Sequence, residues 1–199
     1  MKKFELTNEF IANRFGTKLF RIRALVEFGD VEAGELGGYV EKESNLGHDD
    51  NAWVYGNARV YGDALVYDNA RVYGNARVCG DAQVSGDALV YGNAWVYGDA
   101  QVSGDARVCG DARVCGNGDY AYAHGFGSVN RTTTFFRLKD GGVGVRCGCF
   151  YGTLAQFRDK IRETHGETKK AQEYLMLADL MELRFEEDEN EVGNRKYVE

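Results

Sequence analysis

The most regular feature of the chain is a pair of small apolar positions that recurs every six residues. From residue 50 the pattern G-[DN]-A-x-V-x runs through residue 115 in eleven hexads without an insertion, and only the leading Gly varies. Ala and Val lie two residues apart, so in an extended chain both side chains point to one side and the residue between them points to the other. Each hexad therefore predicts a short strand with Ala and Val facing inward.

The two residues between these strands predict the corners. Gly tolerates positive φ, and Asn or Asp can bond to its own backbone, so Gly-Asn and Gly-Asp favour turns. A helix would need an apolar period of 3.6, and hairpins would need longer strands. A chain that turns the same way after every short strand forms a coil. We expect successive coils to stack at the spacing of paired strands, about 4.8 Å.

These hexads resemble the hexapeptide-repeat proteins, which fold as a left-handed parallel β-helix with three hexads per coil. The resemblance covers residues 50–115, with Val at the aliphatic position and Ala at the small one. Tyr, Cys or Ser follows Val where the family usually has a small residue. Left-handedness is implied by the resemblance only, since right-handed crossovers are the general rule.

The flanking segments resemble bacteriophage and prophage members of the same family, a likeness that names no activity. They read "LFRIRALVEFGDVEAGELGGYVEKESNLG" and "TTTFFRLKDGGVGVRCGCFYGTLAQFRDKIRETHG". The expected fold is mainly β, with a β-helix over residues 50–121 between an N-terminal cap (1–49) and a C-terminal cap (122–199). Val40 and Leu46 continue the six-residue spacing backwards from Ala52, so we expect the N-terminal cap to merge into the first coil.

The C-terminal cap is predicted to be a β-hairpin followed by two helices. "TTTFFRL" and "VGVRCGCF" flank "KDGG", which is a hairpin signal. Thr153 and Gln156 have capping-box spacing, and Gly166 stops that helix. The second helix carries one apolar face: Tyr174, Leu175, Ala178, Met181 and Phe185. We expect the acidic tail "EEDENE" to be solvated.

With three hexads per coil, residues 18 apart stack, and the outward residues sort into three faces. The first face holds Trp53, Arg71, Leu89 and Arg107 with Tyr55, Tyr73, Tyr91 and Cys109. The second face holds Arg59, Arg77, Trp95 and Arg113 with Tyr61, Cys79, Tyr97 and Cys115. The third face is small and polar: Leu65, Gln83 and Gln101 with Tyr67, Ser85 and Ser103.

Two of these faces are rich in arginine and aromatic residues. Stacked tyrosines can stabilise a ladder by themselves, whereas Trp, Tyr and Arg are also the residue types of binding hot spots. Self-association would use the same surface. The sequence predicts a contact surface for a protein partner, or for a second copy in a homodimer or homotrimer, on the second face: Arg59, Tyr61, Arg77, Trp95, Tyr97 and Arg113.

No catalytic residue and no cofactor are predicted. Acyltransferases of the hexapeptide-repeat family place a His general base on a coil, but His48, His124 and His165 all lie outside the eleven hexads. If the chain were a CoA-dependent acyltransferase, which is the alternative function, His124 in "AYAHGFG" would be the candidate base. No glycine-rich phosphate loop is present in the sequence, because the glycines recur at corners and open no helix.

Composition agrees with a cytoplasmic protein that needs no metal. At 199 residues, 44% hydrophobic and a net charge of −7, the chain can bury one core, and neither a membrane span nor a signal peptide is apparent. Five cysteines without framework spacing predict reduced thiols. The two cysteines of "CGC" do not predict a zinc site, because closed zinc sites need four ligands. The corner column Asp63, Asp81 and Asp99 is interpreted as turn-capping carboxylates, with a bridging cation as the alternative.

The charge of the repeats disfavours nucleic acid as a ligand. Residues 50–121 hold nine Asp and five Arg, a net of −4. The hypothesis that remains is a rigid, non-catalytic binding scaffold. Given the phage resemblance, it would engage a host protein in the bacterial cytoplasm and inhibit a defence system. A structural or assembly component of a virion is the third interpretation.

Overall fold

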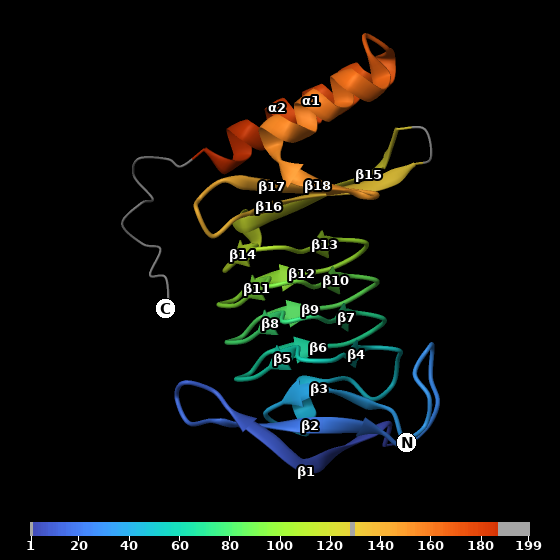
Figure 1. Ribbon diagram of the computed structural model, residues 1–199, viewed down its shortest axis with the longest axis vertical. Coiled ribbons are helices and arrows are strands. Elements are labelled where there is room, and N and C mark those ends of the chain that lie inside the picture. The colour runs from blue at the N-terminus through green and yellow to red at the C-terminus, as the bar shows by residue number, and fades with distance from the viewer. Residues whose placement is uncertain (1, 128–129, 187–199) are drawn as a thin grey trace.

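The computed structural model describes residues 2–127 and 130–186, and it shows a stack of parallel coils between two caps (Figure 1). Each of the eleven hexads contributes one two-residue strand to the stack. These strands are β4 (Trp53–Val54), β5 (Arg59–Val60), β6 (Leu65–Val66), β7 (Arg71–Val72), β8 (Arg77–Val78), β9 (Gln83–Val84), β10 (Leu89–Val90), β11 (Trp95–Val96), β12 (Gln101–Val102), β13 (Arg107–Val108) and β14 (Arg113–Val114).

Three parallel sheets form the faces of the prism, because each strand pairs with the strand three hexads later. The strand orders are β4-β7-β10-β13, β5-β8-β11-β14 and β6-β9-β12. Arg59 is in register with Arg77, and Trp95 with Arg113. The three predicted columns of residues are therefore confirmed.

Ala and Val fill the interior as predicted. Every Ala and Val at these positions from Ala52 to Val114 is at most 1% exposed. The intervening residues lie on the outside of the prism. The strands are held by bonds between coils, for example from the Tyr61 N–H to the Val78 carbonyl at 3.0 Å.

The corners depend on glycine because the coils approach each other closely there. Gly80 has a φ of 70°, and a Cβ on it would lie 3.1 Å from the Gly98 nitrogen of the next coil. Asp68 stands at one such corner with a φ of 57°. Its Oδ2 accepts a bond from the Gly86 N–H at 2.9 Å, which compensates for the strained conformation.

The N-terminal cap extends one sheet of the prism. It contains β1 (Phe4–Ala12), β2 (Lys18–Ala24), β3 (Leu36–Val40) and the 3-10 turn η1 (Glu43–Asn45). β1, β2 and β3 pair antiparallel, and β3 pairs parallel with β5, so the cap continues into the first coil as expected.

The predicted phase of this junction was wrong by two residues. Val40 pairs with Val60, and Leu46 bridges to Val66, so both occupy valine positions rather than continuing the phase of Ala52. The reason is that the corner between Leu46 and Ala52 holds two more residues than a hexad corner does. The six-residue spacing itself persists from Val40 to Leu46.

The C-terminal cap has four strands rather than the predicted two. After η2 (Asn117–Asp119), β15 (Tyr120–Phe126), β16 (Arg131–Arg137), β17 (Val143–Cys147) and β18 (Phe150–Thr153) form one antiparallel sheet in chain order. The predicted hairpin is β16 and β17. β15 and β18 were missed because β15 follows the last hexad without a clear apolar alternation and β18 is only four residues long.

Two helices cover the far face of this sheet, α1 (Leu154–His165) and α2 (Lys169–Phe185). Thr153 and Gln156 form the predicted capping box, and α1 ends at Gly166. Four of the five predicted core residues of α2 are buried, and Leu175 is half-buried. In the described part of the chain, neither helix is long and apolar enough to cross a membrane. The predicted solvated tail lies, from residue 187 on, outside the described residues.

Phe135 and Phe136 show how the sheet of the C-terminal cap serves two cores. Phe135 packs with Phe157 of α1, at 6.0 Å between ring centroids. Phe136 points the other way and joins the core of the solenoid. The sheet therefore closes the open end of the last coil, which would otherwise expose its apolar interior.

Candidate binding groove on the second face

The N-terminal cap covers part of the first face. Trp53, predicted to lie on an outer surface, is fully buried, with its ring 6.2 Å from Phe4 and 5.3 Å from Phe28. Trp53 does point outward from the coil, as its place in the repeat predicts, but the cap covers it. The cap supplies an apolar cover that the repeat pattern does not reveal.

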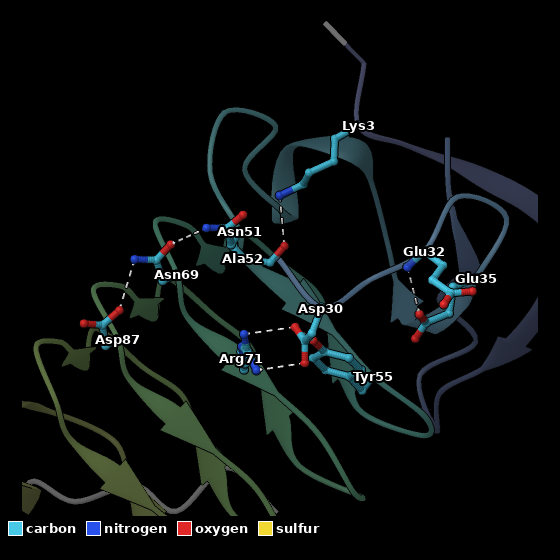
Figure 2. A network of polar contacts seen from close by, with 10 residues as sticks. All are labelled: Lys3, Asp30, Glu32, Glu35, Asn51, Ala52, Tyr55, Asn69, Arg71 and Asp87. Atoms are coloured by element: carbon cyan, nitrogen blue, oxygen red, sulfur yellow. Dashed lines mark hydrogen bonds and ion pairs between the residues drawn. The ribbon is translucent and has the colours of Figure 1, made fainter. Parts of the chain in front are cut away.

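Asp30 of the cap also occupies the polar groups of this face. Figure 2 shows its carboxylate facing Arg71 and Tyr55. The Arg71 Nη2 lies 2.9 Å from Asp30 Oδ1, and the Tyr55 hydroxyl donates to the same oxygen at 3.1 Å. Arg71 and Tyr55 are thus used within the molecule.

The remainder of the first face is a stacked ladder closed by the C-terminal cap. Tyr73 and Tyr91 stack with 4.8 Å between centroids and 2° between planes. The Arg146 guanidinium of β17 lies 6.0 Å from the Tyr91 ring, and Cys109 is only 2% exposed. Here the aromatic residues stabilise the fold, as the ladder interpretation expects.

Two corner columns contain hydrogen bonds between side chains of successive coils. Asn51 donates to Asn69, and Asn69 to Asp87, each at 3.0 Å (Figure 2). Asp63, in the aspartate column, is paired with Lys42 at 2.6 Å, and this bond lowers the pKa of the Asp63 carboxyl. Over residues 2–127 and 130–186 no group of three or more potential metal ligands occurs.

The third face is small and polar as predicted. Tyr67 donates to the Gln83 side chain at 3.4 Å, and the Gln101 N–H donates to the Asn117 side chain at 2.8 Å. The Tyr120 hydroxyl donates to the Gln101 carbonyl at 2.6 Å. This face offers few groups of the kind that anchor a protein partner.

The second face forms one wall of a groove of 690 Å³. Five of the six predicted contact residues line it: Arg59, Tyr61, Arg77, Trp95 and Tyr97. The opposite wall is the turn between β1 and β2, which extends past the coils on the side of β5, β8 and β11 (Figure 1). The turn contributes residues 12–15, which the sequence analysis did not assign to any site.

Arg113, the sixth predicted residue, does not line the groove but stacks on the Trp95 ring. The Trp95 ring lies between two guanidinium groups, 4.7 Å from that of Arg77 and 4.9 Å from that of Arg113. Because β8 and β14 flank β11, the two groups occupy opposite faces of the indole. Tyr97 meets Trp95 edge-on at 6.4 Å. The two cation-π contacts restrict the orientation of Arg77, Trp95 and Arg113.

The groove is electropositive although the protein is acidic. No Asp or Glu is among its lining residues, whereas Arg14, Arg59 and Arg77 are. Within residues 2–127 and 130–186, these three arginines form no ion pair with a carboxylate, and neither does Arg113. Burial, and then the charge of Arg59, lower the pKa of the Arg77 guanidinium. Burial raises the pKa of Tyr61 to about 12.

The turn between β1 and β2 owes its shape to local bonds. The Asn13 carboxamide oxygen accepts from the N–H groups of Phe15 and Thr17 at 2.9 and 3.0 Å, and Gly16 has a φ of 81°. Phe15 is 68% exposed at the tip. The signal in the sequence was two alternating segments separated by "NRFG", which is typical of a hairpin.

The three histidines lie in or beside the caps and outside the groove. His48 stacks on Phe4, and His165 lies beside Tyr174. His124, the candidate base of the alternative function, is exposed, with its Nδ1 2.8 Å from the Thr132 hydroxyl and 3.5 Å from Asp105.

Stacked parallel coils closed by a cap at each end define the chain as a β-solenoid repeat protein. The sequence model of a family described as the YdcK beta solenoid repeat matches residues 52–68, 64–80, 82–98 and 100–116. Each match is about one coil long, so this similarity covers the repeats and neither cap. A comparison with curated proteins gave no match.

Proposed function

We propose that the chain is a non-catalytic binding scaffold that contacts a protein partner through the groove on its second face. The observation that carries this proposal is a contrast between two arginines of equivalent position. Arg71 on the first face is paired with Asp30. Arg77 on the second face makes no ion pair with any carboxylate of the described residues, and it lies beside Arg59 and Trp95 in a hollow that is open to a ligand.

The groove combines the residue types that contribute most at interfaces with a rigid support. Trp, Tyr and Arg dominate binding hot spots because they bury large areas and form directed bonds. The rings and guanidinium groups stand on strands that are bonded to neighbouring coils, and they restrain one another by stacking. Little side-chain entropy remains to be lost when a partner binds, which favours affinity.

The resemblance of the flanks to bacteriophage proteins supports a host protein as the partner. In this proposal the chain acts in the cytoplasm of the bacterial host, and occupation of the partner inhibits a defence system. A second copy of the chain is the other occupant that the groove can serve, as in a homodimer or homotrimer.

A paired set of variants tests the proposal. Trp95→Ala with Tyr97→Ala removes two of the aromatic side chains that line the groove, and Gln83→Ala with Ser85→Ala makes a matched change on the third face. We expect the first pair to lose the complex in a pull-down from host lysate, or the oligomer in sedimentation, and the second pair to retain it. Equal retention by both pairs, with both folded, would contradict the proposal.

Calorimetry tests the enzymatic alternative directly. The proposal expects no binding isotherm for acetyl-CoA or succinyl-CoA, and it expects His124→Ala to keep the biological activity. A clear isotherm that His124→Ala weakens would replace the scaffold by a CoA-dependent acyltransferase.

A further inference from the structure

The charge of the groove limits the chemistry of its ligand, because the charged residues that line it are all arginines. Arg14 enters from the turn between β1 and β2, and Arg59 and Arg77 enter from the coils. With no carboxylate among the lining residues, these charges are not neutralised inside the groove. A ligand that supplies negative charge would relieve the repulsion between Arg59 and Arg77.

The stacking of Trp95 leaves little of this ring for a nucleobase. Single-stranded nucleic acids bind by laying bases on exposed aromatic faces. Both faces of the Trp95 ring are taken by guanidinium groups, at 4.7 and 4.9 Å, and Tyr97 approaches its edge. A guanidinium that stacks on a ring keeps its N–H edge available, and this edge fits a carboxylate in a bidentate pair.

The rim of the groove disfavours a continuous polyanion. Gly80 and Gly98 line the groove, and the next residue along the chain in each case is an exposed aspartate, Asp81 or Asp99. A nucleic acid that followed the coils would carry its phosphates beside these carboxylates. A peptide can place negative charge only where it meets arginine.

The spacing of the groove arginines fits an extended peptide. Arg59 and Arg77 stand on adjacent coils, about 4.8 Å apart along the prism. In an extended chain, side chains on one face are roughly 6.6 Å apart, so two acidic side chains of a short segment can each meet one guanidinium. Arg113 lies outside the lining of the groove, and its Nη1 donates to the carbonyls of Asn93 and Ala112 at 3.2 and 2.8 Å.

We propose that the groove binds an acidic, extended peptide segment of the partner protein, with its carboxylates on Arg59 and Arg77. This inference rests on the proposed function, since it names the class of partner for the same surface. Arg14 closes over the segment from the opposite wall, and Trp95 sets the orientation of Arg77.

Fluorescence anisotropy with the full chain tests the inference. The probe is a labelled nine-residue peptide in which glutamate alternates with serine, and the controls are the same peptide with glutamine and a labelled oligothymidylate of nine nucleotides. We expect the glutamate peptide to bind at least about tenfold more tightly than either control, with weaker binding as salt is raised. No binding of the glutamate peptide below about 1 mM would overturn the inference. Tighter binding of the oligothymidylate would overturn it in favour of a nucleic acid.

Charge-matched variants locate the site. Arg59→Gln with Arg77→Gln should weaken the glutamate peptide at least about tenfold. Arg107→Gln with Lys139→Gln removes the same charge from exposed positions outside the groove and should leave binding within about twofold. An equal loss in both pairs would show a general charge effect and overturn the inference.

The two proposals can fail separately. If the Trp95 and Tyr97 variants lose the partner while the glutamate peptide does not bind, the groove contacts a protein and the acidic class is wrong. If the peptide binds in the groove but the same variants keep the partner, the anion site stands and the proposed function is wrong.

Discussion

Asp30 and Arg71 form a bidentate ion pair, with 2.9 Å from Nη2 to Oδ1 and 3.0 Å from Nη1 to Oδ2. The two residues are 41 apart in the sequence and belong to the cap and to the second coil. This pair fastens the cap to the first face, whereas no carboxylate of the described residues is paired with Arg59, Arg77 or Arg113 on the second face.

Removal of this carboxylate should loosen the cap only slightly. The side chains of Arg71 and Asp30 are 37% and 58% exposed, so solvent screens the pair, and Asp30→Ala should cost about 1 kcal/mol or less. In a chain of this size we expect a fall in melting temperature of about 2 to 4 °C per kcal/mol. Arg107→Ala, on the same face, should leave the melt unchanged. A fall beyond about 10 °C would mean that Asp30 supports more of the fold than this pair.

The inward and outward positions should respond very differently to a new charge. Val78 is fully buried, so Val78→Asp places an unpaired carboxylate in the core and should cost about 4 kcal/mol or more. Arg77→Asp, one residue away on the outside, should cost about 1 kcal/mol, mainly through the lost contact with Trp95. Denaturant unfolding of the two variants measures the difference. Similar midpoints would refute the assignment of the two sides.

Substitutions at two corner glycines should distinguish the cost of backbone strain from the cost of close contact between coils. Gly56 has a φ of 59° with nothing within 4 Å of an added Cβ, whereas Gly80 has a φ of 70° and meets the Gly98 nitrogen at 3.1 Å. Gly56→Ala should cost about 1 to 2 kcal/mol from the left-handed conformation. Gly80→Ala should cost more, because the coil above must shift. Thermal unfolding of both variants compares them, and an equal cost would argue that the coils can separate freely.

Lys3 should make stability depend on alkaline pH. Its Nζ donates to the carbonyls of Asp50 and Ala52 at 2.7 and 2.9 Å, and burial lowers the pKa of Lys3 to about 8 from 10.5. Because the unfolded chain holds the proton up to about 10.5, the folded state is penalised below pH 8 and the penalty disappears as the pH rises to 10.5.

The Lys3→Met variant isolates this effect. We expect the unfolding free energy of the wild type, minus that of the variant, to rise between pH 8 and 10.5. Chemical denaturation at several pH values in that window gives the difference. A difference that stays flat or falls would show that Lys3 remains protonated in the folded protein.

The solenoid could be predicted because its information is local and repeated. A Val and an Ala two residues apart, followed by Gly-Asn or Gly-Asp, specify a strand and a corner without reference to the rest of the chain. The register of Arg59 with Arg77 then follows from three hexads per coil. The capping box of Thr153 and Gln156 is local in the same way.

The groove could be predicted only in part, because half of it comes from a distant segment. The outward side chains on the second face were found by counting, but the wall formed by Arg14 and Phe15 depends on where the turn between β1 and β2 comes to lie. The same limit applies to the burial of Trp53, since no period in the repeats shows that Phe4 and Phe28 cover it.

The constant register of the coils gives the gene a simple way to change the molecule. Duplication or loss of a stretch that encodes one whole coil would lengthen or shorten the column of arginines and return both caps to the same angular alignment. A change by one hexad would instead rotate the C-terminal cap by roughly 120° about the prism axis, relative to the β1–β2 loop that carries Arg14. Recombination between repeats can thus change the length of the groove in steps of one coil, while the inward Ala and Val positions and the corners stay in register.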